Sequence, residues 1–142
     1  MNAPHVFRTR VYYEDTDAAG IVYYANYLKF AERARTEILR EAGIVQRAMA
    51  EEMGVAFAVR SVNVEYLKPA RLDDALEVET TIVAVGGATA EGMQIVRRSG
   101  DRAELAQVGV KLACLKLADG RPARIPETVR AALARHIVVT KA

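Results

Sequence analysis

The sequence YEDTDAAGIVYYANY, residues 13–27, lies between a short β-like segment and the longest helical pattern of the chain. It holds three acidic residues and a glycine, and together with Tyr12 it contains five of the six tyrosines. An acidic loop that leads into a helix N-terminus places a carboxylate beside the positive end of a helix dipole. That pairing suits attack on a carbonyl group, so we expect the rest of the chain to be arranged around this segment.

A strong helical pattern follows, from about residue 24 to residue 42. Its apolar residues recur with the 3.6-residue period of a helix, and they are Leu28, Phe30, Ala31, Ala34, Ile38, Leu39 and Ala42. Asn26 is predicted as the N-cap, and Gly43 is predicted to end the helix. Residues 45–53 predict a short second helix that ends at Gly54. Residues 5–13, before the acidic segment, predict a strand.

Residues 55–118 are predicted to form strands. Apolar residues occupy odd positions in residues 55–59 and even positions in residues 62–66, so the pattern changes at Arg60-Ser61. This change indicates a β-bulge or a switch of the buried face. Pro69 ends that strand, and the next strand runs to a turn at Gly86-Gly87. Residues 88–98 and 103–117 predict two further strands, and residues 127–135 predict a short terminal helix.

These elements predict an α+β fold, in which a curved antiparallel sheet of about five strands wraps one long central helix. The sheet must cover the helix, because no other predicted element is large enough to bury its apolar face. The 142 residues, 51% of them hydrophobic, indicate a single domain spanning residues 1–142. The strands look apolar on both faces, which indicates that the bare face of the sheet packs against a second subunit.

The composition limits the classes of function. A net charge of +2 is too small to indicate binding to nucleic acid. Residues 111–142 are basic, with seven Lys or Arg against Asp119 and Glu127, so this segment either meets phosphate groups or forms a solvated surface. No apolar run approaches the roughly 20 residues that span a bilayer, and no signal-peptide pattern is present, so we expect a soluble cytoplasmic protein. The single cysteine, Cys114, lies in an apolar stretch and is predicted to be buried.

Asp17 is the candidate catalytic carboxylate. The small residues that follow it, including Gly20, let the backbone approach a ligand closely. Apolar walls come from Ile21, Val22, Tyr23 and Tyr24, and a carboxylate beside such walls can serve as a base. Glu14 and Asp15 compete for this role, and Asp17 could instead be a helix cap or a surface charge.

The backbone N–H groups around Tyr24 and Ala25 are the second candidate feature. The first turn of a helix leaves its donors without intrahelical partners, and such donors can hold a developing oxyanion. Every helix has donors of this kind, and water or Asn26 could satisfy them here. These N–H groups therefore indicate an oxyanion site only in combination with the carboxylate beside them.

Several other chemistries lack support in the sequence. Ser61 and Ser99 are the two serines, and neither lies in a Gly-x-Ser-x-Gly motif. His5 and His136 have no partner at metal-ligand spacing, and no nucleotide-binding motif is present. A carboxylate and an oxyanion site without an obvious acid suit a leaving group that departs unprotonated. A thiolate is such a group, because the ordinary pKa of a thiol is only about 8.5, so we predict thioester hydrolysis without a metal or cofactor.

The segment DTDAAGIVYYANY, residues 15–27, resembles the active-site signature of hot-dog-fold acyl-CoA thioesterases of the 4-hydroxybenzoyl-CoA thioesterase family. FAERARTE, residues 30–37, and VEYLKPARLDD, residues 64–74, resemble the YbgC branch of that family, whose members are associated with the Tol–Pal envelope system. The similarity extends from about residue 6 to residue 128. Many members of this branch carry a histidine where this chain has Tyr24, whereas the hydroxybenzoyl enzyme has tyrosine.

The resemblance implies that Asp17 acts as nucleophile or as base toward water, and that the Tyr24 N–H polarises the thioester carbonyl. It implies an active site between two subunits of a homodimer, and commonly a homotetramer. The expected substrate is a short-chain or aromatic acyl-CoA, whose coenzyme A is part of the substrate. The predicted substrate-binding residues are Gly20, Ile21, Val22, Tyr23, Asn26 and Arg60, and the predicted coenzyme-A-binding residues are Lys116, Arg121 and Arg124.

Two other functions remain open on the sequence. The first is a hot-dog dehydratase acting on hydroxyacyl thioesters, although such enzymes usually pair a histidine with an acid and neither histidine lies in the helix-start motif. The second is an acyl-CoA sensor or envelope-associated adaptor that binds without turnover. Sensors of that kind carry an added DNA-binding segment, for which this chain has no room.

Overall fold

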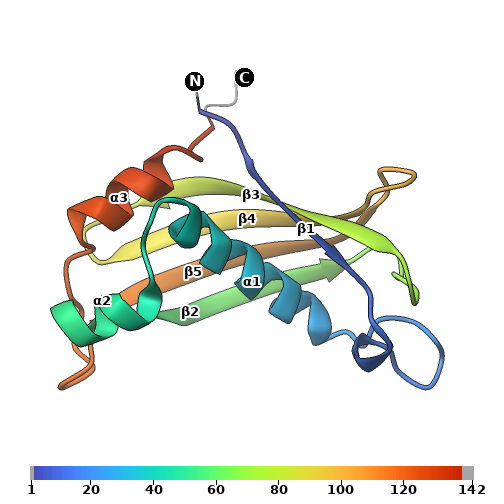
Figure 1. Cartoon of the computed structure of the whole chain (residues 1–142), viewed down its shortest axis with the longest axis horizontal. Helices are drawn as coiled ribbons and strands as arrows, with labels where there is room; N and C mark the ends of the chain where they lie inside the picture. The colour runs from blue at the N-terminus through green and yellow to red at the C-terminus, as the bar shows by residue number, and fades with distance from the viewer. Residues whose placement is uncertain (1, 139–142) are drawn as a thin grey trace.

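The structure, a computed structural model, consists of one five-stranded antiparallel sheet and three helices (Figure 1). The strands are β1 (His5–Arg10), β2 (Val55–Tyr66), β3 (Ala75–Val85), β4 (Thr89–Arg98) and β5 (Glu104–Lys116), and the helices are α1 (Asn26–Glu41), α2 (Gln46–Met53) and α3 (Glu127–Ala134). The predicted α+β class, long helix and five strands are confirmed. The structure describes residues 2–138, so Met1 and residues 139–142 of the predicted domain lie outside it, and the single domain 1–142 stays a prediction.

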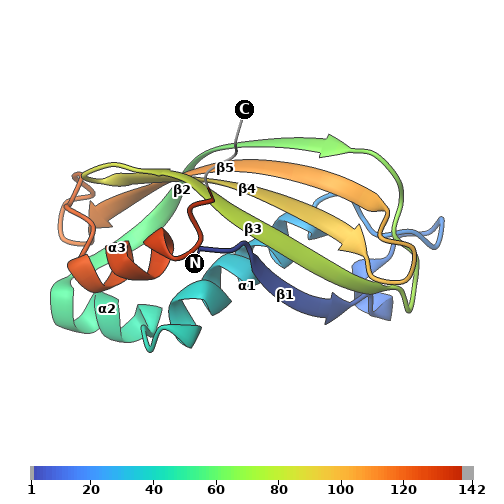
Figure 2. The same ribbon diagram turned by 90° about the horizontal axis from the view of Figure 1, so that it is seen from above.

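The sheet has the strand order β1-β3-β4-β5-β2, which leaves β1 and β2 at its edges. All three helices lie on the same side of the curved sheet (Figure 2). Phe30 and Ala34 of α1 are fully buried with Leu76 and Val78 of β3, within one of the two core clusters. Replacing a buried phenylalanine by alanine in such a core typically costs about 3–5 kcal/mol. The helix-side residues of the sheet and the inward face of α1 therefore form the centre of the core.

The opposite face of the sheet carries paired charges. Arg97 of β4 pairs with Glu79 of β3 at 3.3 Å, and Lys111 of β5 pairs with Glu91 of β4 at 3.2 Å. Cross-strand pairs of opposite charge stabilise neighbouring strands and are at home in solvent. This outer face also exposes Val6 and Met93, so it mixes charged and apolar side chains and is less apolar than predicted.

The two ends of α1 differ in how well the sequence predicted them. Gly43 ends the helix as predicted: it has φ +82°, its N–H donates to Arg40 O at 2.9 Å, and the Ile44 N–H donates to Leu39 O at 2.9 Å. This is the Schellman arrangement, which needs a left-handed residue at this point. The predicted N-cap is wrong, because Ala25 occupies that position and Asn26 is the first helical residue. Leu28, predicted on the buried side, is 36% exposed.

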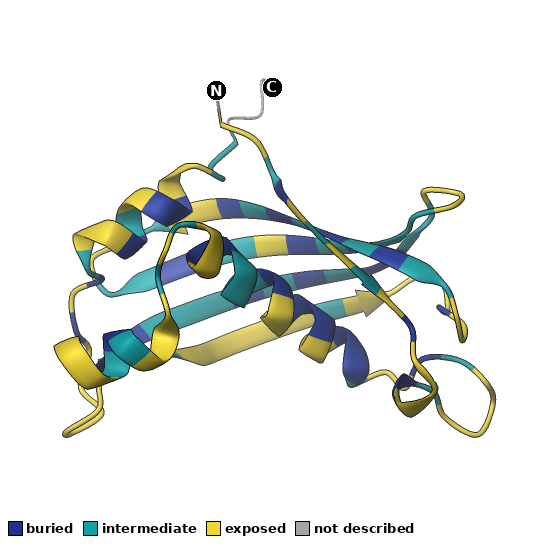
Figure 3. Ribbon diagram, viewed as in Figure 1, coloured by how far each residue is buried: buried dark blue, intermediate teal, exposed yellow. Residues whose placement is uncertain are grey.

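The pattern change at Arg60 is a β-bulge. Val59 pairs with Leu112 and Ser61 pairs with Lys111, so Arg60 is the extra residue of β2. The bulge keeps Val59 and Val62 on the same, helix-side face. Both are exposed, at 52% and 44%, because β2 is an edge strand that α1 does not cover, and Figure 3 shows most of β2 as exposed.

Three further observations concern Cys114, the hydropathy of the helices and possible metal ligands. Cys114 is fully buried, as predicted, and lies in the core cluster formed by the sheet and all three helices. Within residues 2–138, none of the helices combines the length and the hydropathy needed to cross a membrane. The same described residues contain no cluster of three side chains suited to hold a metal ion.

Candidate active site

The acidic segment forms a tight hairpin between β1 and α1. Thr16 and Val22 make an antiparallel bridge, the Asp17 N–H donates to Ile21 O at 2.9 Å, and the Gly20 N–H donates to Asp17 O at 3.0 Å. Gly20 has φ +77°, a backbone conformation that glycine adopts at little cost. The hairpin therefore fixes the backbone of Asp17 a few residues before the helix begins.

A second loop supports the hairpin from behind. The Val22 N–H donates to Ala70 O at 2.9 Å, and Ile21 forms a bridge with Arg71. The side chain of Arg98, at the end of β4, holds this second loop: Nη2 donates to Pro69 O at 2.9 Å and Nε donates to Asp74 at 3.1 Å. The sheet is thus connected to the hairpin through the Arg98 guanidinium and residues 69–74.

Arg98 also binds a second carboxylate, because Nη1 donates to Asp101 Oδ2 at 2.9 Å. The Ala103 N–H donates to the other oxygen of Asp101 at 3.0 Å. The Ala103 N–H and the Arg98 guanidinium together hold the pKa of Asp101 below its usual range. Asp74 and Asp101 in turn raise the pKa of Arg98.

Asp15 is a buried brace rather than a free carboxylate. It is 4% exposed; Oδ2 accepts the Tyr12 N–H at 2.8 Å, and Oδ1 accepts the Asn26 side-chain amide at 2.9 Å. Its main-chain oxygen accepts the Tyr23 N–H at 2.9 Å. Asp15 therefore connects the end of β1, the hairpin and the first residue of α1. Sequence reasoning considered it a competitor of Asp17, and its spacing gave no sign of this role.

Asp17 differs from Asp15 in almost every respect. It is exposed in the protomer, and Oδ1 accepts the N–H of Ala19 at 2.9 Å. Of the residues predicted to wall it, Val22 is buried, whereas Tyr23 and Tyr24 are 46% and 61% exposed. The protomer alone therefore does not enclose this carboxylate.

Several backbone N–H groups near the start of α1 have no acceptor among residues 2–138. The Tyr23 N–H is taken by Asp15 O, and the Asn26 N–H donates to Tyr23 O at 2.8 Å. Among residues 2–138, no protein acceptor binds the N–H groups of Tyr24 and Ala25. These two groups are the ones that the sequence singled out, and they follow Asp17 on the same hairpin-to-helix connection.

A cluster of aromatic rings surrounds this helix start. Tyr66, at the end of β2, donates its hydroxyl to Tyr24 O at 3.0 Å, and its ring lies 6.1 Å from that of Tyr24 and 5.5 Å from that of Tyr27. The Tyr27 hydroxyl accepts the Ala70 N–H at 3.0 Å. Burial raises the pKa of both Tyr27 and Tyr66. Sequence reasoning missed Tyr66, because about forty residues separate it from the helix start.

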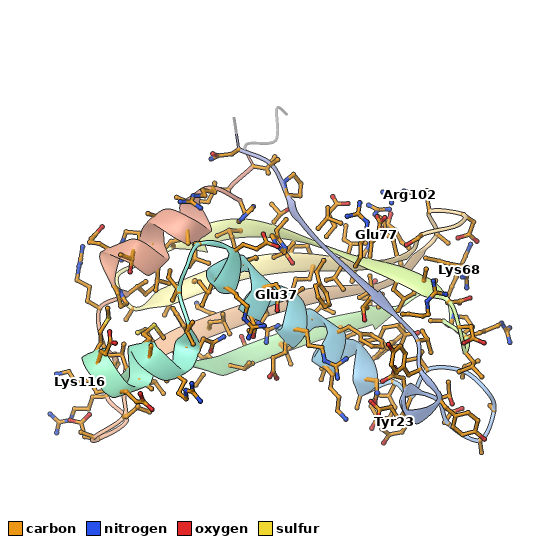
Figure 4. The ribbon with its side chains drawn as sticks, viewed as in Figure 1. Tyr23, Glu37, Lys68, Glu77, Arg102 and Lys116 are labelled. Carbon is orange, nitrogen blue, oxygen red and sulfur yellow. The ribbon has the colours of Figure 1, made fainter. Side chains whose placement is uncertain are left out.

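The predicted coenzyme-binding residues lie elsewhere. Lys116, Arg121 and Arg124 are exposed at the end of the sheet where β2 begins. Figure 4 shows Lys116 and Tyr23 near opposite ends of the molecule. Arg60 is exposed at the bulge of β2, between these two ends. One protomer therefore brings Asp17, Gly20, Ile21, Val22, Tyr23, Tyr24 and Asn26 together, and it separates them from the basic residues.

A cavity of about 250 Å³ lies beneath the second half of α1. The sheet contributes its floor, and α1 and α3 contribute its walls, with Phe57, Ile82 and Leu133 among the apolar lining residues. The polar lining includes Arg35 of α1, whose Nη1 donates to Gln94 Oε1 at 3.0 Å. No sequence pattern pointed to this cavity, because its residues come from elements far apart in the chain.

A long helix covered by a five-stranded antiparallel sheet, with an acidic hairpin at the helix start, defines a hot-dog fold of the thioesterase kind. The model of one family, the Thioesterase-like superfamily, matches residues 11–133, and the chain belongs to this family. The predicted resemblance is thereby confirmed at the level of the family.

Individual relatives agree with this assignment. The chain is 45% identical over 126 residues to the acyl-CoA thioesterase YbgC of Haemophilus influenzae, covering 89% of this chain and 91% of that protein. It is 43% identical over 120 residues to the acyl-CoA thioester hydrolase YbgC of Escherichia coli, covering 84% of this chain and 88% of that protein. The crystal structure of a probable thioesterase from Bartonella henselae is similar, with a TM-score of 0.81 and 35% identity over 87% of this chain and all of that one. The predicted enzyme class, thioester hydrolase, is confirmed.

Proposed function

We propose that this protein hydrolyses a short-chain or aromatic acyl-CoA to the free acid and coenzyme A, without a metal or cofactor. The observation that carries the proposal is the junction of hairpin and helix. There, the exposed carboxylate of Asp17 precedes the Tyr24 and Ala25 N–H groups, which no described residue accepts. The YbgC proteins of Haemophilus influenzae and Escherichia coli, named as acyl-CoA thioester hydrolases, support the substrate class.

The reaction follows from these groups. The Tyr24 N–H, at the positive end of α1, donates to the thioester oxygen and stabilises the negative charge that develops there. Asp17 either attacks the carbonyl carbon or takes a proton from a water molecule that attacks it. The carbon–sulfur bond then breaks and the thiolate of coenzyme A leaves. In the first route the resulting anhydride reacts with water, which releases the acid and restores the Asp17 carboxylate.

The exposed edge of β2 indicates the missing wall of the site. It is a 12-residue edge strand with Val59, Val62 and Tyr66 each more than 40% exposed. A long apolar edge of this kind is a template for pairing with another strand. In a two-fold homodimer two β2 edges would pair antiparallel, and the Tyr66 end of one strand would lie beside the Val55 end of the other.

This dimer would complete the site from two subunits. Val55 pairs with Lys116 within the sheet, and the Lys116 N–H donates to Arg121 O at 2.8 Å. The Val55 end of β2 therefore carries the basic residues, and Tyr66 marks the end that carries the helix start. Pairing would bring Lys116, Arg121 and Arg124 of one subunit toward Asp17 of the other, where they would meet the phosphates of coenzyme A. Association of two such dimers into a tetramer stays a prediction.

Replacement of Asp17 tests the catalytic proposal. Asp17→Asn and Asp17→Ala should lower kcat for acyl-CoA hydrolysis at least ~10²-fold, measured by trapping the released thiol. The melting temperature should stay close to that of the wild type, because Asp17 is exposed. Glu14→Gln, which changes an exposed carboxylate on the same segment, is the matched control and should keep full activity. Wild-type turnover in Asp17→Ala would remove Asp17 from the mechanism.

A further inference from the structure

The cavity beneath α1 has the size of a small acyl group. Its volume of about 250 Å³ corresponds to roughly eight water molecules at ~30 Å³ each. Most of its lining is apolar, including Ile38, Phe57, Leu112 and Leu133. Phe57 and Val59 belong to the edge strand β2, so the cavity reaches the same edge that the proposed dimer would cover.

The charged residues that line the cavity are one cation, Arg35, and two acids, Glu32 and Glu91. Arg35 lines the cavity, and Nη1 donates to Gln94 Oε1 at 3.0 Å. Gln94 is fully buried, and its amide nitrogen donates to Ala31 O at 2.9 Å and to Thr80 Oγ1 at 3.0 Å. Because these bonds occupy both ends of the Gln94 amide, they fix its orientation. The guanidinium is thus held in one place by a network of satisfied hydrogen bonds.

Arg35 also has no carboxylate partner in the protomer. Among residues 2–138, no Asp or Glu oxygen lies within 4.0 Å of its guanidinium. Burial lowers the pKa of Arg35, and the more distant charge of Glu32 opposes that effect. A guanidinium remains protonated at neutral pH even so. A partly buried cation without a counter-ion favours a ligand that supplies an anion.

We propose that this cavity receives the distal end of the acyl group and that Arg35 selects thioesters whose acyl group ends in a carboxylate. The inference rests on the proposed function, since the acyl group must come from the thioester bound at a helix start. A carboxylate is the chemical match, because it can accept two parallel N–H bonds from one guanidinium. Of the two acidic residues that line the cavity, Glu32 is exposed, so solvent screens its repulsion of the ligand. Glu91 is paired with Lys111 at 3.2 Å, which offsets its charge.

In the proposed dimer, the acyl group could extend from the catalytic hairpin of one subunit into the cavity of the other. The Val55 half of β2, which includes Phe57 and Val59, would lie beside the Tyr66 end of the partner strand. The cavity of one subunit would then open next to the catalytic hairpin of the other subunit. Arg35 would contact the substrate far from the thioester carbon, so its effect falls on selection between substrates.

The test compares two thioesters of equal chain length, glutaryl-CoA and pentanoyl-CoA, through kcat/KM. The wild type should prefer glutaryl-CoA. Arg35→Met keeps the apolar stem and removes the charge, and it should lower kcat/KM for glutaryl-CoA by about 10–100-fold, the loss typical of a charged hydrogen bond. Its kcat/KM for pentanoyl-CoA should change by less than about 3-fold, and Arg35→Lys should recover part of the lost selectivity.

A second measurement separates this inference from the proposed function. Titration calorimetry of free glutarate against Asp17→Asn, with and without Arg35→Met, reads recognition without turnover. If glutarate binds to Asp17→Asn only when Arg35 is present, while the wild type hydrolyses no thioester, the proposed function fails. The recognition of the carboxylate by Arg35 then stands. If the wild type hydrolyses both thioesters with a ratio that Arg35→Met leaves unchanged, the inference fails and the proposed function stands. Dissociation of a dimer by Arg35→Met, with an unchanged ratio, would also overturn the inference.

Discussion

Two aspartates two positions apart illustrate how much chemistry a single residue's surroundings decide. Asp15 and Asp17 share the same hairpin, yet Asp15 is buried with both oxygens bonded and Asp17 is exposed. The residue pattern singled out this segment, with Asp17 as the catalytic candidate and Asp15 as its competitor. It could not separate them, because the partners of Asp15 come from Tyr12 and from Asn26, which was predicted as a cap instead.

Removal of the Asp15 brace should destabilise the fold. Asp15→Ala leaves the Tyr12 N–H and the Asn26 amide without their acceptors, and we expect the free energy of unfolding to fall by about 2–4 kcal/mol. Urea denaturation measures this change. Asp15→Asn should recover part of the loss, because one oxygen remains. Equal denaturation midpoints for Asp15→Ala and the wild type would show that the brace contributes nothing.

At the scale of the elements, sequence patterns predicted most of the architecture. The period of α1, the glycine that ends it and the bulge in β2 are local properties of the chain, and all three are confirmed. Leu28 shows what such patterns cannot predict. The helical period identifies an apolar face, but it does not say whether other residues of the same chain cover that face. The strand predicted for residues 5–13 ends at Arg10 instead, because Tyr13–Asp15 form a 3-10 turn that positions Asp15.

The ion pair between Arg98, at the end of β4, and Asp101 gives a pH-dependent prediction. The pKa of Asp101 is lower in the folded chain than in the unfolded chain. Its contribution to stability is therefore present above the unfolded pKa of about 3.9 and is lost as the pH falls through the folded value. Asp101→Asn should lower the melting temperature at pH 7, and the difference from the wild type should shrink steadily as the pH falls below about 4.

The control for this prediction is Glu52→Gln, which neutralises an exposed acid of α2 that forms no ion pair among residues 2–138. Melting curves between pH 7 and pH 2.5 compare the three proteins. A difference between Asp101→Asn and the wild type that persists unchanged at the lowest pH would contradict the assigned role of the charge.

At the scale of the whole molecule, the sequence could not predict that the two groups of predicted site residues lie apart. Lys116, Arg121 and Arg124 lie at and after the end of the last strand, and Asp17 precedes the first helix, so the distance between them depends on how the sheet is ordered. Lys116 pairs with Val55 at the start of β2, whereas the start of α1 contacts Tyr66 at the end of β2. The two segments therefore lie at opposite ends of the chain's fold (Figure 1). The dimer proposed above, paired at β2, would join them.

Disruption of the β2 edge tests this assembly. Val62→Lys places a charge on the exposed edge, and we expect a monomer with at least ~10-fold lower activity, since an unpaired edge lysine opposes strand pairing. Light scattering coupled to gel filtration gives the mass. Val83→Lys, at a valine of β3 that is 58% exposed, should leave both mass and activity unchanged. A wild type that is active as a monomer would refute the shared site.

Cys114 is the one cysteine of the chain, and its reactivity can report on the basic segment that carries Arg121 and Arg124. The sulfur is fully buried, burial raises its pKa, and the segment that carries Arg124 lies over it. An alkylating reagent can reach it only when that segment opens, so the labelling rate counts these openings. If coenzyme A binds across the segment, it should slow the labelling, and a mass spectrometer would then detect ligand contact without any turnover.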